Sequence, residues 1–183
     1  MTNTELIAEI GWNHMGDMVL AKEMIKAASE AGADYAKFQT WSVSRLKAGP
    51  WDNDGRREIY IKAELKEEQH YELKEYCDSS SIKFMSSVFS VPDAELLHKV
   101  MNDYVKIPSA ESRNTNLLDF VNNNFKKVLI STGTSTLDEI KRSIDILDNV
   151  EIVLLHCVSS YPCHLEGSNL PRINHLKSLN NKI

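Results

Sequence analysis

Long apolar runs and export signals are missing from this chain of 183 residues. No stretch approaches the roughly 18 consecutive apolar residues that a membrane span needs. The first residues, MTNTELIAEIG, lack the basic segment and the apolar core of a signal peptide. We therefore expect a cytoplasmic protein that makes no use of a membrane.

An excess of basic residues is also missing. The net charge is -5 and the isoelectric point is near 5.7, whereas a protein that binds a nucleic-acid backbone needs a basic face. We therefore expect no nucleic-acid partner. An anionic small molecule remains compatible with this charge, provided that a local cluster of lysines and backbone N–H groups binds it.

Cysteine is scarce, and the nucleotide-binding glycine motifs are absent. Cys77, Cys157 and Cys163 are odd in number and form no C-x-x-C pair, so we expect reduced thiols. Cys157 follows His156, which allows a nucleophile, but we favour a cysteine that fills a buried strand. No G-x-G-x-x-G follows the first strand and no G-x-x-x-x-G-K-[ST] occurs, which argues against a nucleotide-binding fold.

The residues that are present predict one α/β domain. The chain is 42% hydrophobic and 26% charged, which is typical of a globular protein with a sizeable core. Apolar runs alternate with segments of helical periodicity. We expect strands near 6–9, 33–38, 82–86, 104–107, 127–130 and 151–155, and helices near 18–31, 66–79, 92–101, 116–124, 136–147 and 170–179.

Polar residues at the ends of these strands favour a parallel (β/α)8 TIM-type barrel over a doubly wound sheet. About six of the eight βα units are present in residues 1–183. Residues 41–64 show no periodicity, and we expect them to form a lid or a binding loop at the carboxyl end of the second strand.

Six segments, in order, resemble the sialic acid synthase family, which comprises N-acetylneuraminate synthases and their legionaminate and pseudaminate relatives. They are AEIGWNHMGD, AGADYAKFQT, FMSSVFS, VKIPSAE, VLISTGTST and LLHCVSSYP, and the likeness extends from Glu9 to about Leu179. The resemblance implies a barrel, often followed by a small antifreeze-like domain. It also implies a transferase that joins phosphoenolpyruvate to an N-acetylated aminosugar, giving a nonulosonic acid and phosphate with a divalent metal such as manganese.

The resemblance assigns roles to individual residues. Glu9 matches an acid beside the reacting carbons, although a carboxylate that merely ties down its loop is an alternative from the sequence alone. His14, in the same motif, is expected to be a structural loop residue. The phosphoenolpyruvate-binding residues are Lys37, Lys106, Ser87, Ser109 and Ser131, and the sugar-binding residues are Gln39, Glu111, Ser159 and Tyr161. Two lysines among hydroxyl groups suit a ligand with a phosphate and a carboxylate.

The chain departs from the family pattern at several points. Ser159 stands where many members have Asn, and Trp12 and Met15 stand where smaller or polar residues are frequent. The next family motif, G-[YL]-S-D-H-T, would follow Ile183, so the histidine ligands of the metal are expected beyond this chain, with the remaining barrel units and any antifreeze-like domain. We therefore expect the natural polypeptide to continue, and residues 1–183 alone to be inactive and prone to aggregate.

Three functional readings follow from the sequence. The first is condensation of phosphoenolpyruvate with an N-acetylated aminosugar, with a homodimer as a candidate assembly. The second is an aldolase that forms a Schiff base through Lys37 or Lys106, which needs a lysine of depressed pKa in an apolar pocket. The third is a non-catalytic, truncated fragment that binds a sugar or an anion.

Overall fold

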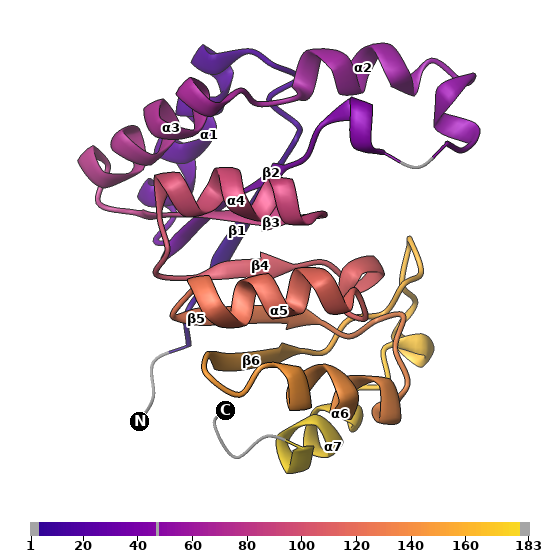
Figure 1. The fold of residues 1–183 in the computed structure, drawn as a ribbon. Helices are drawn as coiled ribbons and strands as arrows, with labels where there is room; N and C mark the ends of the chain where they lie inside the picture. The colour runs from indigo at the N-terminus through magenta and orange to yellow at the C-terminus, as the bar shows by residue number, and fades with distance from the viewer. Residues whose placement is uncertain (1–3, 47, 180–183) are drawn as a thin grey trace. The chain divides into compact units, whose positions relative to one another are not determined.

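The computed structural model describes residues 4–46 and 48–179, which fall into two compact units, residues 1–87 and 88–183 (Figure 1). In each unit, strands alternate with helices along the chain, as the sequence predicts. Residues 181–183, which the sequence suggests could begin another strand, lie outside the described residues. No helix in the described part of the chain combines the length and the apolarity needed to cross a membrane.

The first unit contains a parallel pair of strands with a break in register. β1 pairs with β2, and β2 is in turn the neighbour of β3. Glu9 lies opposite Lys37, but the next pair is Gly11 with Phe38, so one extra residue bulges out of β1. The elements are β1 (Ile7–Gly11), α1 (Met18–Glu30), β2 (Tyr35–Thr40), α2 (Arg56–Ala63), α3 (Glu67–Ser79) and β3 (Lys83–Val88).

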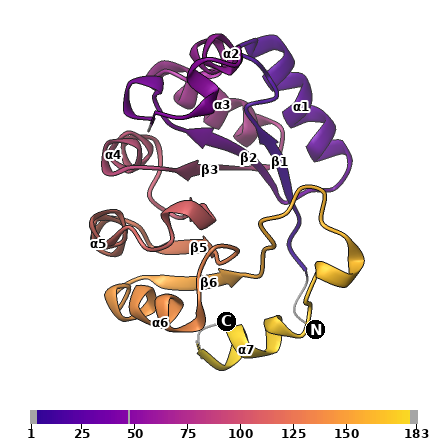
Figure 2. The same ribbon diagram turned by 90° about the vertical axis from the view of Figure 1, so that its right-hand side faces the viewer.

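The core of this unit lies between its strands and the helices α1 and α3, which run side by side (Figure 2). The rings of Phe38 and Phe84 stack with their centroids 5.7 Å apart, and both are fully buried. Ile25 of α1 and Leu73 of α3 are also fully buried. Residues i and i+2 of a strand share a face, so Lys37 and Gln39 lie on the other face of β2 from Phe38.

The second unit is a parallel sheet in the order β4, β5, β6, with α4, α5 and α6 along one face (Figure 2). Register places Ile107, Ile130 and Leu154 side by side, and all three are buried. The elements are α4 (Val91–Val100), β4 (Val105–Ile107), α5 (Thr115–Asn124), β5 (Lys127–Ser131), α6 (Leu137–Ile146), β6 (Glu151–Leu155) and α7 (Arg172–Leu179).

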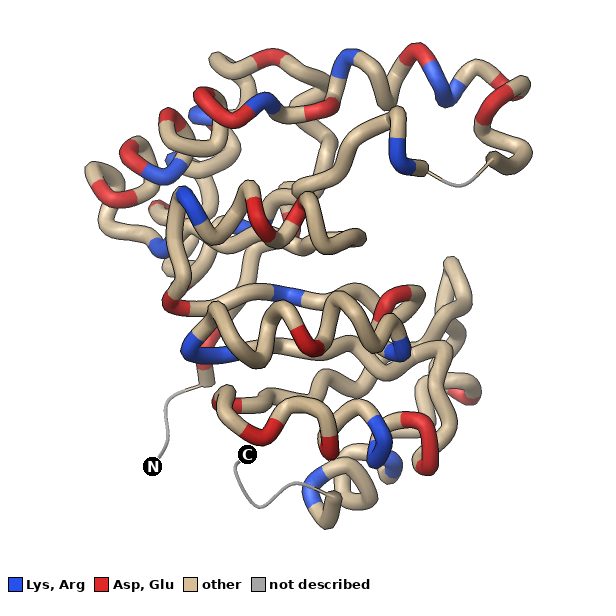
Figure 3. The backbone as a smooth tube through the Cα atoms, in the orientation of Figure 1, with Lys and Arg blue, Asp and Glu red and all other residues tan. Residues whose placement is uncertain are grey.

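Alternation along these strands explains the lysine inside β4. Val105 and Ile107 are fully buried, whereas Lys106 between them is half-buried and is paired in register with Leu129. Lys106 therefore lies on the face of the sheet opposite to its apolar neighbours. Figure 3 shows that Lys, Arg, Asp and Glu are interspersed along the helices. Lys106 is one of several charged residues that lie within strands, as Lys37 does in β2.

Two sequence predictions need correction. β2 and β3 extend to Thr40 and Val88, so Gln39, Ser86 and Ser87 lie inside strands and not at their exits. The reason is that the polar side chains of Thr40 and Ser86 hydrogen-bond to each other across the sheet, 2.7 Å apart. In addition, the expected structureless loop 41–64 contains the helix α2 and two short 3₁₀ turns.

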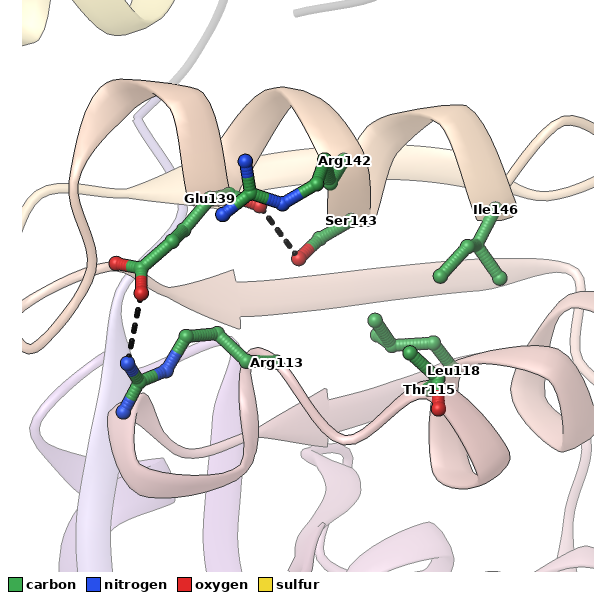
Figure 4. Close-up of a pocket in the computed structure, with 7 residues that line it drawn as sticks. All are labelled: Arg113, Thr115, Leu118, Glu139, Arg142, Ser143 and Ile146. Carbon is green, nitrogen blue, oxygen red and sulfur yellow. Dashed lines mark hydrogen bonds and ion pairs between the residues drawn. The ribbon is translucent and has the colours of Figure 1, made fainter.

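The helix α6 begins where the sequence predicts, at a capping box. The Thr136 hydroxyl accepts a hydrogen bond from the Glu139 N–H, while the Glu139 carboxylate accepts one from the Thr136 N–H at 2.8 Å. Arg113, which precedes α5, also binds this carboxylate at 2.8 Å. Beside this pair is a pocket of about 210 Å³ (Figure 4), lined by Arg113, Thr115, Leu118, Glu139, Arg142, Ser143 and Ile146.

Replacing Glu139 with Gln is expected to lower the melting temperature at neutral pH by a few degrees. The Thr136 N–H and Arg113 lower the pKa of Glu139 from its ordinary 4.5 to about 2. Its stabilising effect is therefore complete above the unfolded pKa and is lost as the pH falls through the folded pKa. Thermal melts at decreasing pH should show the difference from the parent shrinking.

The matched control is Asp138→Asn, because Asp138 is 81% exposed and lies 3.8 Å from Lys141. It should leave the melting temperature nearly unchanged. A Glu139→Gln deficit that stays constant into acid would contradict the assignment.

Candidate functional site

A buried ammonium group is the centre of the first cluster of predicted residues. Lys37 in β2 is only 6% exposed, and its Nζ forms an ion pair with Oε2 of Glu9 on β1. The same Nζ donates a hydrogen bond to Oγ of Ser87 on β3 at 2.9 Å. Three neighbouring strands thus bring Glu9, Lys37 and Ser87 together, as the sequence predicts.

The electrostatics of Lys37 reflect two opposing effects. Burial lowers the pKa of its ammonium group, because the charged form loses hydration, and the nearby Glu9 carboxylate raises it. Burial is the larger effect. Glu9 itself keeps 52% of its side chain exposed, so it can reach a molecule in solvent while it holds Lys37.

Further polar groups gather around Gly11, at the end of β1. A methyl group placed on Gly11 would lie 3.3 Å from Oε1 of Glu9 and 3.6 Å from Nε2 of Gln39. It would lie 3.9 Å from Nδ2 of Asn13, which donates to the Ile10 carbonyl at 2.8 Å. Gln39 therefore belongs to the same cluster as Glu9, and its contact with a sugar stays a prediction.

A chain of hydrogen bonds that the sequence reasoning missed supports this cluster from the other face of the sheet. His70 of α3 contacts the Lys66 carbonyl through Nδ1 at 2.8 Å. A carbonyl only accepts, so Nδ1 carries a proton, and Nε2 shares a hydrogen bond with the Thr40 hydroxyl at 2.8 Å. The Thr40 hydroxyl also shares a hydrogen bond with the Ser86 hydroxyl at 2.7 Å. The sequence signal that could have predicted these hydrogen bonds is the presence of two hydroxyl side chains, Thr40 and Ser86, in strands whose residues are mostly buried.

His14 occupies the interior of the loop after β1, as predicted for a structural residue. Its ring is 1% exposed, and Nδ1 accepts a hydrogen bond from the Gly16 N–H at 3.1 Å. Burial, and then the proximity of His70, lower the pKa of His14. Its Nε2 has no hydrogen-bond partner within the described residues. A neutral ring that shapes the loop fits these observations.

The second unit has a cluster of its own at the carboxyl ends of β4, β5 and β6. The Gly133 N–H donates to Oγ of Ser109 at 3.0 Å, and Thr134 donates to the Ser109 carbonyl at 2.6 Å. A methyl group on Gly133 would lie 2.8 Å from Oγ of Ser159 and 3.1 Å from Oγ of Ser109. Ser109 and Ser159 are thus close together, and Ser131 is buried two residues before Gly133.

For the other predicted residues of this unit, the structure gives surroundings that differ from those of the Ser109 cluster. Glu111 uses its carboxylate to accept a hydrogen bond from Asn114 at 2.9 Å, before α5 begins. Tyr161 is 96% exposed in the loop after β6. Lys106 is half-buried within β4. The sugar-binding roles of Glu111 and Tyr161, and the use of both clusters by one anion, stay predictions.

The cysteines are unpaired thiols, in agreement with the sequence. Burial raises the pKa of the Cys77 thiol to about 12, so it is unreactive at neutral pH. Among residues 4–46 and 48–179, no three His, Cys, Asp or Glu side chains are grouped in a way that could hold a metal ion. The divalent metal stays a prediction.

The model of the NeuB family matches residues 24–182. The chain is 36% identical to the N,N'-diacetyllegionaminic acid synthase of Legionella pneumophila, over 90% of this chain and 51% of that protein. It is 34% identical to the pseudaminic acid synthase of Helicobacter pylori, over 91% of this chain and 53% of that protein. The chain thus spans about half the length of the curated relatives it matches.

A solved structure shows the same fold. The N-acetylneuraminic acid (sialic acid) synthetase of Leptospira borgpetersenii, crystallised with citrate, superposes with a TM-score of 0.88 at 32% identity. The match covers 98% of this chain and 62% of that one. The likeness to sialic acid synthases is therefore confirmed, and the chain belongs to the NeuB family.

Proposed function

We propose that the protein containing this chain condenses phosphoenolpyruvate with an N-acetylated aminosugar, giving a sialic-acid-like nonulosonic acid and phosphate. Family membership and the printed names of the relatives support a product of this class. The observation that carries the proposal is the buried Lys37, held by Glu9 and Ser87. A cation in such a place is costly to bury unless an anion pairs with it, and Glu9 is the anion that does so here.

Lys37 suits the binding of a phosphate or carboxylate group. An ammonium group has three N–H donors, and Glu9 and Ser87 take two of them. The third donor and the positive charge remain for a ligand, with Ser87 fixing the direction of the Nζ atom. The corresponding roles proposed in the second unit are Lys106 for charge and Ser109 and Ser131 for hydroxyl contacts.

Glu9 suits a proton-transfer role. In the proposed reaction, the methylene carbon of phosphoenolpyruvate bonds to the aldehyde carbon of the open-chain sugar. The aldehyde oxygen takes the electron pair of its double bond and gains a proton to become a hydroxyl group, and water captures the cation left on the phosphate-bearing carbon. The half-exposed Glu9 carboxylate accepts the proton of that water, and the C–O bond to phosphate then breaks. We assign the sugar contact to Gln39, whose side chain lies with that of Glu9 around Gly11. The described residues do not form a metal site, and no step here uses one.

A Schiff-base aldolase is the second candidate, because burial lowers the pKa of Lys37 as a nucleophilic amine requires. The ion pair with Glu9 favours the charged form, which cannot attack a carbonyl. Borohydride reduction in the presence of pyruvate separates the two reactions. A covalent adduct on Lys37 would overturn the proposed condensation and support the aldolase reaction.

Replacing Lys37 with Met should weaken phosphoenolpyruvate binding while keeping most of the side-chain volume. A lost charge-assisted hydrogen bond costs about 1.5–3 kcal/mol, which is a roughly ten- to hundredfold rise in Kd. Calorimetric titration of the full-length protein measures this change. Lys26→Met is the control, because Lys26 is 65% exposed on α1. If the two variants bind phosphoenolpyruvate with equal affinity, Lys37 does not contribute to the anion site.

Replacing Glu9 with Gln should lower the turnover number far more than it changes either Michaelis constant, because the proton acceptor is lost while the shape is kept. Phosphate release by the full-length protein is the assay. Glu5→Gln is the matched control, since Glu5 accepts a hydrogen bond from Tyr35 near the amino end of β2. If Glu9→Gln turns over normally, Glu9 only ties down its loop.

A further inference from the structure

The three tryptophans of the chain gather around one tyrosine of α2. Trp12 and Trp41 meet the Tyr60 ring edge to face, with ring centroids 5.6 Å and 5.5 Å away. Trp51 lies at 5.6 Å in a tilted arrangement. Such pairs stabilise their geometry beyond simple burial. We call Trp12, Trp41, Trp51 and Tyr60 the aromatic cluster.

Backbone contacts fix this cluster beside the loop after β1. Gly16 has φ +82°, and a methyl group on it would lie only 1.9 Å from the Lys62 carbonyl oxygen, so α2 packs directly on that loop. At the end of α2, the Glu64 carboxylate accepts hydrogen bonds from the Val43 N–H at 2.8 Å and the Ser42 hydroxyl at 3.2 Å. The segment from Trp41 to Glu64 is thereby tied at both ends.

The aromatic cluster is continuous with the first cluster of polar residues. Trp12 directly follows Gly11, around which the Glu9 and Gln39 side chains gather. Trp41 comes two residues after Gln39, at the end of β2. Both tryptophans thus lie within two residues, along the chain, of Gly11 and Gln39, where the polar cluster is formed.

Trp12 is the member best placed to touch a ligand that contacts Glu9 and Gln39. Trp41 is only 7% exposed. Trp51 has the Arg57 guanidinium over its ring at 5.6 Å from the centroid. Trp12 is half-buried and meets Tyr60 with its ring nearly perpendicular, at 83°. Tyr60 positions Trp12 and does not itself need to meet the ligand.

We propose that Trp12 contacts the acyl methyl group of the sugar acceptor and so determines which acylated sugar is used. This inference rests on the proposed condensation and names a specificity residue for it. An aromatic ring beside a few directed polar groups is the usual composition of a small-molecule site. Glu9 and Gln39 supply the polar groups, and Trp12 supplies the apolar surface that a methyl group prefers to water.

Tryptophan fluorescence tests the contact without any requirement for activity, because the three tryptophans of residues 1–183 all lie in the aromatic cluster. The full-length protein is titrated with N-acetylmannosamine and with N-formylmannosamine, which differ by one methyl group. We expect the acetyl sugar to change the emission and to bind about tenfold more tightly than the formyl sugar. A Trp41→Phe, Trp51→Phe double variant should keep this response, and Trp12→Phe should lose most of it.

Kinetics of the same protein give the second readout. Trp12→Ala should raise the Michaelis constant for the acetyl sugar about tenfold and leave that for phosphoenolpyruvate unchanged, whereas Trp12→Phe should restore most of the affinity. Ile61→Ala is the control, because Ile61 is 56% exposed on the same helix as Tyr60. It should change neither constant.

Failure of the inference and failure of the proposed function have different signatures. Equal responses to the two sugars, no response to either, or equal changes in both Michaelis constants for Trp12→Ala would overturn the role of Trp12. A methyl-dependent fluorescence response without phosphate release from phosphoenolpyruvate would support the contact and overturn the condensation.

Discussion

The burial of the Lys37 ammonium group constrains the rest of the first unit. A charge that is 6% exposed needs a counter-charge at contact distance, and Glu9 provides it from the facing position on β1. The register shift that follows Glu9 then turns the chain at Gly11, where Gln39 and Asn13 approach. The geometry of the site is thus a consequence of neutralising one cation.

The two faces of this sheet carry separate sets of polar contacts between β2 and β3. Lys37 and Ser87 meet on one face, and Thr40 and Ser86 meet on the other, so the same two strands are joined twice within a few residues. His70 extends the second connection to α3. Every hydroxyl in this chain of bonds has a partner, which favours a single arrangement of β2 and β3.

The order of strands and helices, and the grouping of Glu9 with Lys37, could be predicted from the sequence because periodicity and strand-end residues are local signals. Family likeness named Ser87 and Gln39, and the structure brings Ser87 to Lys37 and Gln39 to Gly11. The helix α2 was missed because its stability comes from the contacts of Tyr60 with tryptophans far along the chain, and not from apolar periodicity. The helix propensity of a short sequence segment carries no information about contacts with residues outside that segment.

The contact between Gly16 and the Lys62 carbonyl has a consequence for protein engineering. The loop after β1 and the segment that carries α2 have complementary surfaces with no room for an added carbon atom. A chimaera that takes one of them from a relative with a larger residue at either surface would force the two apart. The two segments therefore keep their fit in a chimaera when both are exchanged together.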